Sequence, residues 1–362
     1  MTSFHLSYSQ IRDRIEAIDP IKYARTRNFT DGAVTYLSPF ISRGVISTQQ
    51  VMQSVLSRGY KPYQAEKFLQ ELAWREYYQR VWQAKGDQIW TDLKQEQAEV
   101  KHHEMIAAVE NAATGIEAVD QHIEKLYETG YMHNHVRMYV ASITCNVGGA
   151  HWKQPAQWMY FHLLDGDIAS NNCSWQWVAG AFASKKYYCN QENINKYTGS
   201  FQRQSFLDQS YEDIAGMEVP RILQATSSPL RITNFPATEP LSIDPSKPTL
   251  IYNSYNLDPI WRQGEDVNRV LLLEPSHFEK YPVSEKVLAF ILFLGQQIKG
   301  VQVHVGEIRE LSGFNLISKE HPAFCHYPGI KDDRNWMFPT VTGYYPSFFS
   351  FWKKCERELA RM

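Results

Sequence analysis

Residues 165–180, DGDIASNNCSWQWVAG, combine carboxylates, amides and tryptophans at short spacing. Asp165 and Asp167 can accept hydrogen bonds from hydroxyl or N–H groups, and the amide of Asn171 can both donate and accept. Trp175 and Trp177 offer flat apolar surfaces of the kind that line sites for planar ligands. The alternative interpretation is that the two acids only cap a helix. The set therefore indicates either a helix start or a site for a planar, hydrogen-bonding ligand.

A second segment, TGYMHNHVRM at residues 129–138, supplies partners for these acids. A carboxylate among aromatic rings must be paired or hydrogen-bonded to stay charged, and Arg137 is the natural candidate. Asn134 adds another amide. His133 and His135 are two residues apart on a predicted helix and face different ways, so we predict no metal site.

Two earlier segments have both local and functional interpretations. In VTYLSPFISRGVIS, residues 34–47, Ser38 can cap a helix with proline at the first helical position, and a helix start also suits a phosphate group. In FLQELAWREYY, residues 68–78, Trp74 and Arg75 taken alone are better explained as a core residue beside a surface charge than as functional residues. Neither segment decides the function by itself.

The composition narrows the class of protein. Aromatic residues make up 14% of the 362 residues, including 10 Trp and 21 Tyr, which favours a planar cofactor. The net charge of -2 argues against a globally basic nucleic-acid binder but leaves room for a local basic face.

The five cysteines form no C-x-x-C pair and are expected to be reduced, with Cys325 and Cys355 packed in the C-terminal part. No export signal or membrane span is recognisable, which predicts a cytoplasmic protein.

The pattern of apolar residues divides the chain into three parts. Residues 1–214 have the three- and four-residue spacing of helices, and residues 215–247 form a linker rich in Pro, Ser and Thr. In residues 248–362, TLIYNS, RVLLLEP and GVQVHVGE are predicted strands, SEKVLAFILFLGQQI is a predicted helix, and another helix follows near the C-terminus. We therefore predict an α + α/β fold, with an all-helical domain followed by a small Rossmann-like α/β domain.

The four segments in this order resemble the FAD-binding helical domain of the photolyase/cryptochrome flavoproteins, over roughly residues 20–200. The resemblance depends on L-S-P followed by G-x-I-S, on E-L-x-W-R-E-Y, on G-Y-M-H-N-x-x-R-M, and on D-G-D-x-A-x-N-x-x-x-W-Q-W-x-A-G. Family members usually carry an α/β antenna domain in front, which we expect this chain to lack.

The resemblance implies FAD as the cofactor and assigns a role to each matching position. Asn134 would face the flavin N5, and Arg137 and Asp165 would form a salt bridge over the ring. Thr35, Leu37 and Ser38 would hold the FAD phosphates, and Val34 stands where the family often has another hydroxyl, which leaves one phosphate contact open. The residues implied to bind FAD are Tyr23, Thr35, Leu37, Ser38, Phe68, Arg75, Asn134, Arg137, Asp165, Asp167 and Asn171.

The same resemblance implies an electron route. Trp175 matches the ring next to the flavin, and Trp152 matches the next ring outward. The outermost tryptophan of the family is replaced by Val109, so that photoreduction would be slower or end on another aromatic residue, such as Trp158 or a tyrosine.

A pocket for a flipped pyrimidine dimer is also implied. Trp177, Glu71, Trp74 and Met138 match its residues, with Glu71 as the acid that protonates or hydrogen-bonds a pyrimidine carbonyl. The alternative for Glu71 is an ordinary ion pair with Arg75 one helical turn later.

Together these expectations describe a light-dependent DNA-repair enzyme, a deoxyribodipyrimidine photo-lyase. Its partner would be damaged DNA, single- or double-stranded, and the protein is expected to be a monomer with FAD and no metal. The alternative is a blue-light photoreceptor of the cryptochrome kind without repair activity, which the replaced outer tryptophan and the near-neutral charge favour. A light-independent flavin oxidoreductase is the weakest hypothesis, because the G-x-G-x-x-G phosphate fingerprint is absent.

Overall fold

A computed structural model describes residues 4–361 and divides the chain into two compact units. The helical unit consists of Lys22–Val34 and Lys85–Leu230. The sheet unit consists of the residues before Lys22, the segment Thr35–Ala84 and the residues from Arg231 onward. The helical half of the sequence is thus shared between two units, and the predicted domain boundaries at 214 and 248 stay a prediction.

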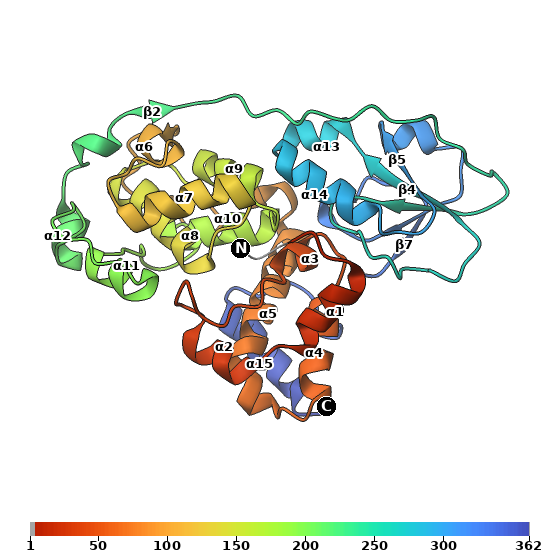
Figure 1. Ribbon diagram of the computed structural model, residues 1–362, viewed down its shortest axis with the longest axis horizontal. Helices are drawn as coiled ribbons and strands as arrows, with labels where there is room; N and C mark the ends of the chain where they lie inside the picture. Colours follow the sequence, from red (N-terminus) through yellow and green to blue (C-terminus); the bar gives the residue numbers. More distant parts are fainter. Residues whose placement is uncertain (1–3, 362) are drawn as a thin grey trace. The chain divides into compact units, whose positions relative to one another are not determined.

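The helical unit is built from short helices around one apolar core (Figure 1). In α7 (Glu117–Thr129), buried Val119, Ile123 and Leu126 follow the helical spacing of a core-facing stripe. Gly130 caps the C-terminal end of this helix with a φ of 72°, and it lies so close to Leu164 that an added Cβ would be 2.6 Å from the leucine side chain. The other elements are α2 (Pro20–Thr26, shared with the sheet unit), η1 (Gly86–Trp90), β1 (Met105–Ile106), α6 (Ala107–Glu110), α8 (Asn134–Ala141), the π-helix η2 (Ser142–Val147), α9 (Lys153–His162), α10 (Ile168–Ala179), α11 (Gln191–Thr198), α12 (Tyr211–Gly216), η3 (Arg221–Leu223) and β2 (Thr226–Ser227), which pairs antiparallel with β1.

The sheet unit combines N-terminal and C-terminal helices with a parallel sheet of five strands (Figure 1). The strand order is β5-β4-β3-β6-β7. The chain places β4 and β5 on one side of β3 and then returns to place β6 and β7 on the other side, with all strands parallel. The strands are β3 (Thr249–Tyr252), β4 (Asn268–Leu273), β5 (Val301–Val305), β6 (Leu316–Lys319) and β7 (Ile330–Asp332). The helices are α1 (Tyr8–Glu16), α3 (Ser38–Ser42), α4 (Thr48–Ser57), α5 (Pro62–Lys85), α13 (Pro275–Lys280), α14 (Glu285–Gly295), η4 (Ile308–Leu311), η5 (Pro322–Phe324) and α15 (Phe348–Leu359).

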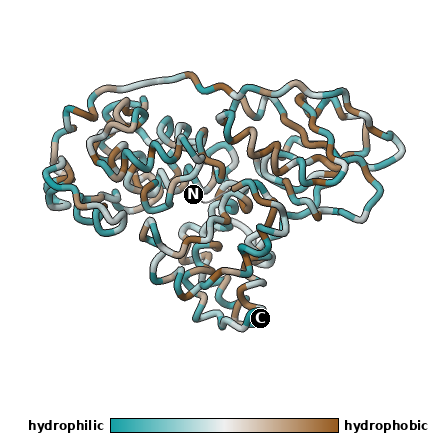
Figure 2. Tube along the Cα trace, viewed as in Figure 1, coloured by the Kyte–Doolittle hydropathy of each residue, from teal (hydrophilic) through white to brown (hydrophobic). Residues whose placement is uncertain are grey.

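The apolar pattern accounts for the centre of this sheet. Ile251 of β3 lies opposite Val270 of β4, and both are fully buried, as expected for strands covered on two faces. Helix α14 packs so closely on β4 that an added Cβ on Gly295 would lie 2.5 Å from the side chain of Leu271. In Figure 2, hydrophobic stretches run through the part of the sheet unit where Figure 1 draws β4 and β5.

The structure confirms the predicted strands β3, β4 and β5 and the predicted helices α14 and α15. The strands β6 and β7 were not predicted, because each has four or fewer residues and includes lysine. The expectation that Cys325 is packed is wrong, since it lies exposed just after η5, whereas Cys355 is buried in α15. Among residues 4–361, no helix is both long and apolar enough to cross a membrane.

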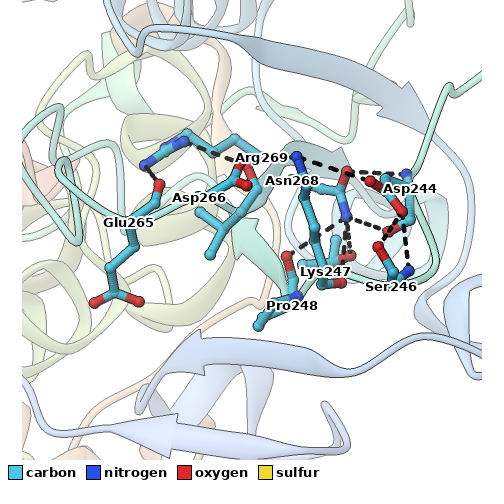
Figure 3. A network of polar contacts seen from close by, with 10 residues as sticks. Asp244, Ser246, Lys247, Pro248, Glu265, Asp266, Asn268 and Arg269 are labelled. Atoms are coloured by element: carbon cyan, nitrogen blue, oxygen red, sulfur yellow. Dashed lines mark hydrogen bonds and ion pairs between the residues drawn. The ribbon is translucent and has the colours of Figure 1, made fainter.

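The end of the predicted linker is fixed to β4 by polar contacts (Figure 3). The side-chain amide of Asn268 donates to the carbonyl of Asp244 at 2.9 Å, and its oxygen accepts from the backbone N–H of Asp244 at 3.0 Å. Lys247 pairs with Asp266 at 2.8 Å. These bonds hold the chain beside β4 immediately before it enters β3.

Helix α5 is attached to the C-terminal segment through a buried acid. Glu76 is 3% exposed and accepts hydrogen bonds from the backbone N–H groups of Met337 and Phe338, at 2.5 and 3.1 Å. Burial raises the pKa of Glu76, against the opposing effect of the two N–H groups. Beside it, the guanidinium of Arg80 lies 3.5 Å from the ring centre of Trp336.

Candidate functional site

The predicted ion pair between Arg137 and Asp165 is present in the helical unit. Arg137, on α8, donates from Nη2 to both carboxylate oxygens of Asp165, at 2.9 and 2.8 Å. Its Nε also donates to the carbonyl of Met132 at 2.9 Å. Asp165 lies in the loop before α10 and is only 6% exposed, so this charge-assisted pair keeps a buried carboxylate compensated.

Asp167 caps α10, as its local interpretation predicted. Its carboxylate accepts from the backbone N–H of Ser170 at 2.7 Å, and its side chain is almost fully buried. A carboxylate has room for further N–H donors, so capping and ligand binding are compatible. Asn171, in the first turn of the same helix, donates its amide to the carbonyl of Ala156 at 2.8 Å and so connects α10 to α9.

Three other predicted residues of this unit differ in exposure. Asn134 is the first residue of α8 and is exposed, and the preceding His133 caps the helix by accepting from the N–H of His135. Tyr23 on α2 is half-buried, and half-buried Met138 packs against the apolar core. The amide of Asn134 is therefore accessible to a ligand.

The tryptophans divide into buried and exposed rings. Trp152 and Trp175 are 0% and 2% exposed and belong to the same core, in which Val109 is also fully buried. Trp177, two residues along α10 from Trp175, is 36% exposed, and its ring centre lies 5.8 Å from that of Tyr187. One helix thus presents one ring to the core and one ring to solvent.

Asp92 was missed by the sequence analysis. Its carboxylate accepts from the indole Nε1 of Trp152 at 2.6 Å, across 60 residues of sequence. No local pattern marks Asp92, since it lies in a polar turn after η1. Only the predicted importance of Trp152 could have drawn attention to its partner.

In the sheet unit, the segment before α3 has an unusual backbone. Tyr36 has a φ of 52°, a left-handed conformation that is uncommon outside glycine and often found at functional sites. The hydroxyl of Thr35 accepts from the N–H of Leu37 at 3.4 Å. Helix α3 begins at Ser38 with Leu37 at the cap position, so the prediction that Ser38 is the cap is wrong by one residue.

The predicted residues of α5 also lie in the sheet unit and have partners there. Arg75 donates to the hydroxyl of Ser42 on α3, and Phe68 is 2% exposed. The ring of Trp74 is stacked on Phe348 of α15, with a centroid distance of 3.8 Å and an angle of 9° between the planes. One face of Trp74 is therefore covered by the chain itself.

The groups in the helical unit suit the edge of a flavin ring. They comprise two buried carboxylates, a guanidinium and an exposed amide, which together match ring N–H and carbonyl groups. The hydroxyl of Ser170, in the first turn of α10, is buried without a hydrogen-bond partner among the described residues, as expected where a bound ligand supplies one. Within residues 4–361, no three His, Cys, Asp or Glu side chains are grouped to hold a metal ion.

Part of the chain is similar to known flavoproteins. The sequence profile described as the FAD binding domain of DNA photolyase matches residues 68–211. A deoxyribodipyrimidine photo-lyase of Synechococcus sp. is 33% identical over 169 residues, which cover 44% of this chain and 35% of the relative. A cryptochrome DASH of Danio rerio is 29% identical over 181 residues, covering 44% of this chain and 32% of the relative. A crystal structure of a class III photolyase from Agrobacterium tumefaciens covers 53% of this chain and 43% of that chain, at 26% identity and a TM-score of 0.45.

Residues 68–211 are therefore similar to the FAD-binding domain of DNA photolyases, and the cofactor that this match indicates is FAD. The chain spans about a third of the length of the curated relatives it matches. Phe68, Arg75, Asn134, Arg137, Asp165, Asp167 and Asn171 lie inside the matched segment, whereas Tyr23, Thr35, Leu37 and Ser38 lie before it.

Proposed function

We propose that the protein is a light-dependent DNA-repair enzyme that splits a cyclobutane pyrimidine dimer, as a deoxyribodipyrimidine photo-lyase does. Reduced FAD supplies the electron under blue light. The observation that carries the proposal is the pair of tryptophans on α10, because Trp175 is buried while Trp177 keeps a third of its surface exposed. An exposed ring on the FAD-binding domain provides a surface on which an extruded base can stack.

The polar residues of the helical unit would orient the flavin ring. The Arg137–Asp165 pair would lie over the ring, and Asp167 would accept a ring N–H while it caps α10. The exposed amide of Asn134 would approach N5, where it stabilises the reduced state. Ser170 would gain the partner that its hydroxyl lacks.

Further residues, most of them in the sheet unit, are each proposed to contact FAD. Thr35, Leu37 and Ser38 would hold the FAD phosphates, at the bend formed by Tyr36. The residues proposed to pack around the cofactor are Tyr23, Phe68 and Arg75, of which Arg75 is held in place by Ser42.

Trp177, Trp74 and Met138 are each proposed to contact the lesion. Extruding a dimer costs a few kcal/mol, and stacking on an aromatic ring returns about 1–3 kcal/mol per base. Glu71, half-buried on α5, would donate a hydrogen bond or a proton to a pyrimidine carbonyl as negative charge develops on it.

A photoreceptor without repair activity, of the cryptochrome kind, is the second candidate. The stacking of Phe348 on Trp74 favours it, because a ring covered on one face offers less surface to a base. The net charge of -2 also gives little general attraction to DNA. In either case we propose that the protein is cytoplasmic and monomeric, and size-exclusion chromatography with light scattering would test the monomer.

Repair and signalling are separated by one experiment. The purified protein, loaded with FAD and reduced, is illuminated with single- and double-stranded oligonucleotides that contain a thymine dimer, and restored thymines are measured. Light-dependent restoration supports the photo-lyase. Intact FAD photoreduction without restoration on either substrate would reject it and favour the photoreceptor, and a protein that takes up no FAD would reject both. A dark sample and an oligonucleotide without a dimer serve as controls.

A further inference from the structure

The fully buried Trp152 donates two hydrogen bonds to side chains of the turn after η1. Its indole Nε1 donates to Oδ1 of Asp92 at 2.6 Å, and its backbone N–H donates to the side-chain oxygen of Gln97 at 2.9 Å. Gln97 in turn donates from its backbone to Oδ2 of Asp92, at 2.9 Å, and from its amide to the carbonyl of Ala150, also at 2.9 Å. The carboxylate is therefore fixed on the indole N–H by an independent set of bonds.

The environment of Asp92 differs from that of other tryptophan partners in the molecule. In the sheet unit, Trp261 also donates to a carboxylate, that of Asp332, but Arg262 already pairs with this acid at 2.7 Å. Asp92 instead lies 3.4 Å from Nε2 of His151.

The neighbouring His151 lies in an environment that favours its neutral form. Burial lowers the pKa of His151, against the opposing effect of Asp92. Its Nδ1 accepts from the backbone N–H of Lys153 at 3.3 Å, which leaves the ring proton on Nε2, toward Asp92. Because the side chain of Asp92 is 18% exposed, a proton on it can also exchange with water.

Trp158 provides a second contrast within the helical unit. It is as deeply buried as Trp152, but its Nε1 donates to the phenol oxygen of Tyr127 at 3.0 Å. A neutral phenol is a much weaker base than a carboxylate. Of these two buried indoles, Trp152 is the one whose N–H proton has a strong acceptor in place.

We propose that Asp92 is the proton acceptor of oxidised Trp152, so that Trp152 and Asp92 together form the terminal electron donor for photoreduction. The inference rests on the proposed function, because it requires Trp152 to lie on the electron route. Trp152 loses one electron, which passes through Trp175 to a photoexcited oxidised flavin. The N–H bond of the indole radical cation then breaks, and the proton moves to Oδ1 of Asp92. The products are a neutral indolyl radical and a carboxylic acid.

This transfer explains how the route can end at Trp152. With Val109 fully buried in the core, no further ring is available at that position to receive the positive charge. Loss of the proton removes the charge from the buried indole and slows return of the electron. A cellular thiol or another one-electron reductant would later restore Trp152, as the proton returns from Asp92.

The test compares three variants with the wild-type protein. Asp92→Asn keeps the shape and a hydrogen-bond acceptor but removes the base, and Asp92→Glu restores a carboxylate. Glu96→Gln, at an exposed position of the same turn, controls for the loss of one negative charge. All are loaded with oxidised FAD and excited by a blue laser flash, and transient absorption distinguishes the neutral tryptophan radical from the radical cation.

We expect the neutral radical in the wild type, in Glu96→Gln and in Asp92→Glu. In Asp92→Asn we expect the radical cation, with a lifetime at least about tenfold shorter, because the amide cannot take the indole proton and the positive charge that favours return of the electron remains on the ring. A neutral radical of unchanged lifetime in Asp92→Asn would overturn this inference alone. Absence of any tryptophan radical in the wild type would overturn the proposed electron route and this inference with it.

A second measurement needs no FAD. Ultraviolet resonance Raman spectra of the protein without cofactor, minus those of Trp152→Phe, isolate the indole bands of Trp152. Asp92→Asn should shift the band that reports N–H hydrogen bonding toward a weaker bond, whereas Glu96→Gln should leave it unchanged. An unchanged band in Asp92→Asn would mean that the bond is absent in solution, which also overturns the inference.

Discussion

The predicted functional residues of the helical unit and of the sheet unit are held in place in different ways. In the helical unit the partners are near in sequence: Arg137 and Asp165 are 28 residues apart. In the sheet unit, Trp74 of α5 is stacked on Phe348, at the other end of the chain. The position of Asp165 therefore depends on a residue nearby in the sequence, while the position of the Trp74 ring depends on a distant segment. The following substitutions test this difference, in order of their expected effect on the free energy of unfolding.

Arg137→Met is expected to have the largest effect. It leaves the buried carboxylate of Asp165 without its cation, which typically destabilises a protein by about 3–5 kcal/mol. Chemical denaturation measures the change. The control is Lys186→Met, which breaks a short ion pair to the 73% exposed Glu99 and should cost at most about 1 kcal/mol. Equal losses in both variants would mean that the Asp165 pair behaves as a surface contact.

His133 makes the stability of the helical unit depend on pH. Burial is the main cause that lowers its pKa to about 4 in the folded protein, below the unfolded value of 6.5, with His135 and Arg137 acting in the same direction. The unfolded state therefore binds more protons as the pH falls between these values, and stability is lost. From about pH 7 to about pH 5 this residue should remove about 2 kcal/mol.

His133→Asn isolates this contribution. Asparagine keeps a good helix cap for α8 but does not titrate. The unfolding free energy of the variant should fall less than that of the wild type over the same pH interval. Identical pH profiles would show that the pKa of His133 is the same in the folded and unfolded protein, contrary to its buried position.

The Trp74–Phe348 contact should give a smaller, measurable coupling. A double-mutant cycle with Trp74→Ala and Phe348→Ala is expected to yield about 0.5–1.5 kcal/mol, typical of an aromatic pair. Phe349→Ala is the matched control, because Phe349 is 64% exposed. If Phe348→Ala also increases dimer repair, the stacked ring restricts the lesion pocket. A coupling near zero would show that α15 does not hold Trp74.

Trp177→Ala should change folding least and repair most clearly. An exposed ring contributes within about 0.5 kcal/mol to stability. Loss of about 1–3 kcal/mol of base stacking should lower light-dependent repair roughly 5- to 150-fold while FAD remains bound. The measurement is thymine restoration under illumination, with FAD absorbance as the internal control. Unchanged repair would show that the lesion pocket lies elsewhere.

The sequence predicted the parts of the site that depend on local order. The spacing of Asp167 before its apolar helix predicted the cap, and the aromatic surroundings of Asp165 predicted its pairing with Arg137. It could not predict Asp92 or Phe348, because each meets its tryptophan only after distant segments pack together. The strands β6 and β7 were missed for the same reason. Each has four or fewer residues, too few to show an apolar alternation, and each is stabilised as a strand by pairing with its neighbours in the sheet.

The buried carboxylate of Glu76 also has a consequence for synthesis of the chain. Its two backbone donors, Met337 and Phe338, follow it by more than 260 residues, so a growing chain carries α5 for most of its translation without them. All segments of the helical unit, in contrast, have emerged by residue 230. We therefore expect the helical unit to reach protease resistance on the ribosome first, with α5 protected only after release of the finished polypeptide.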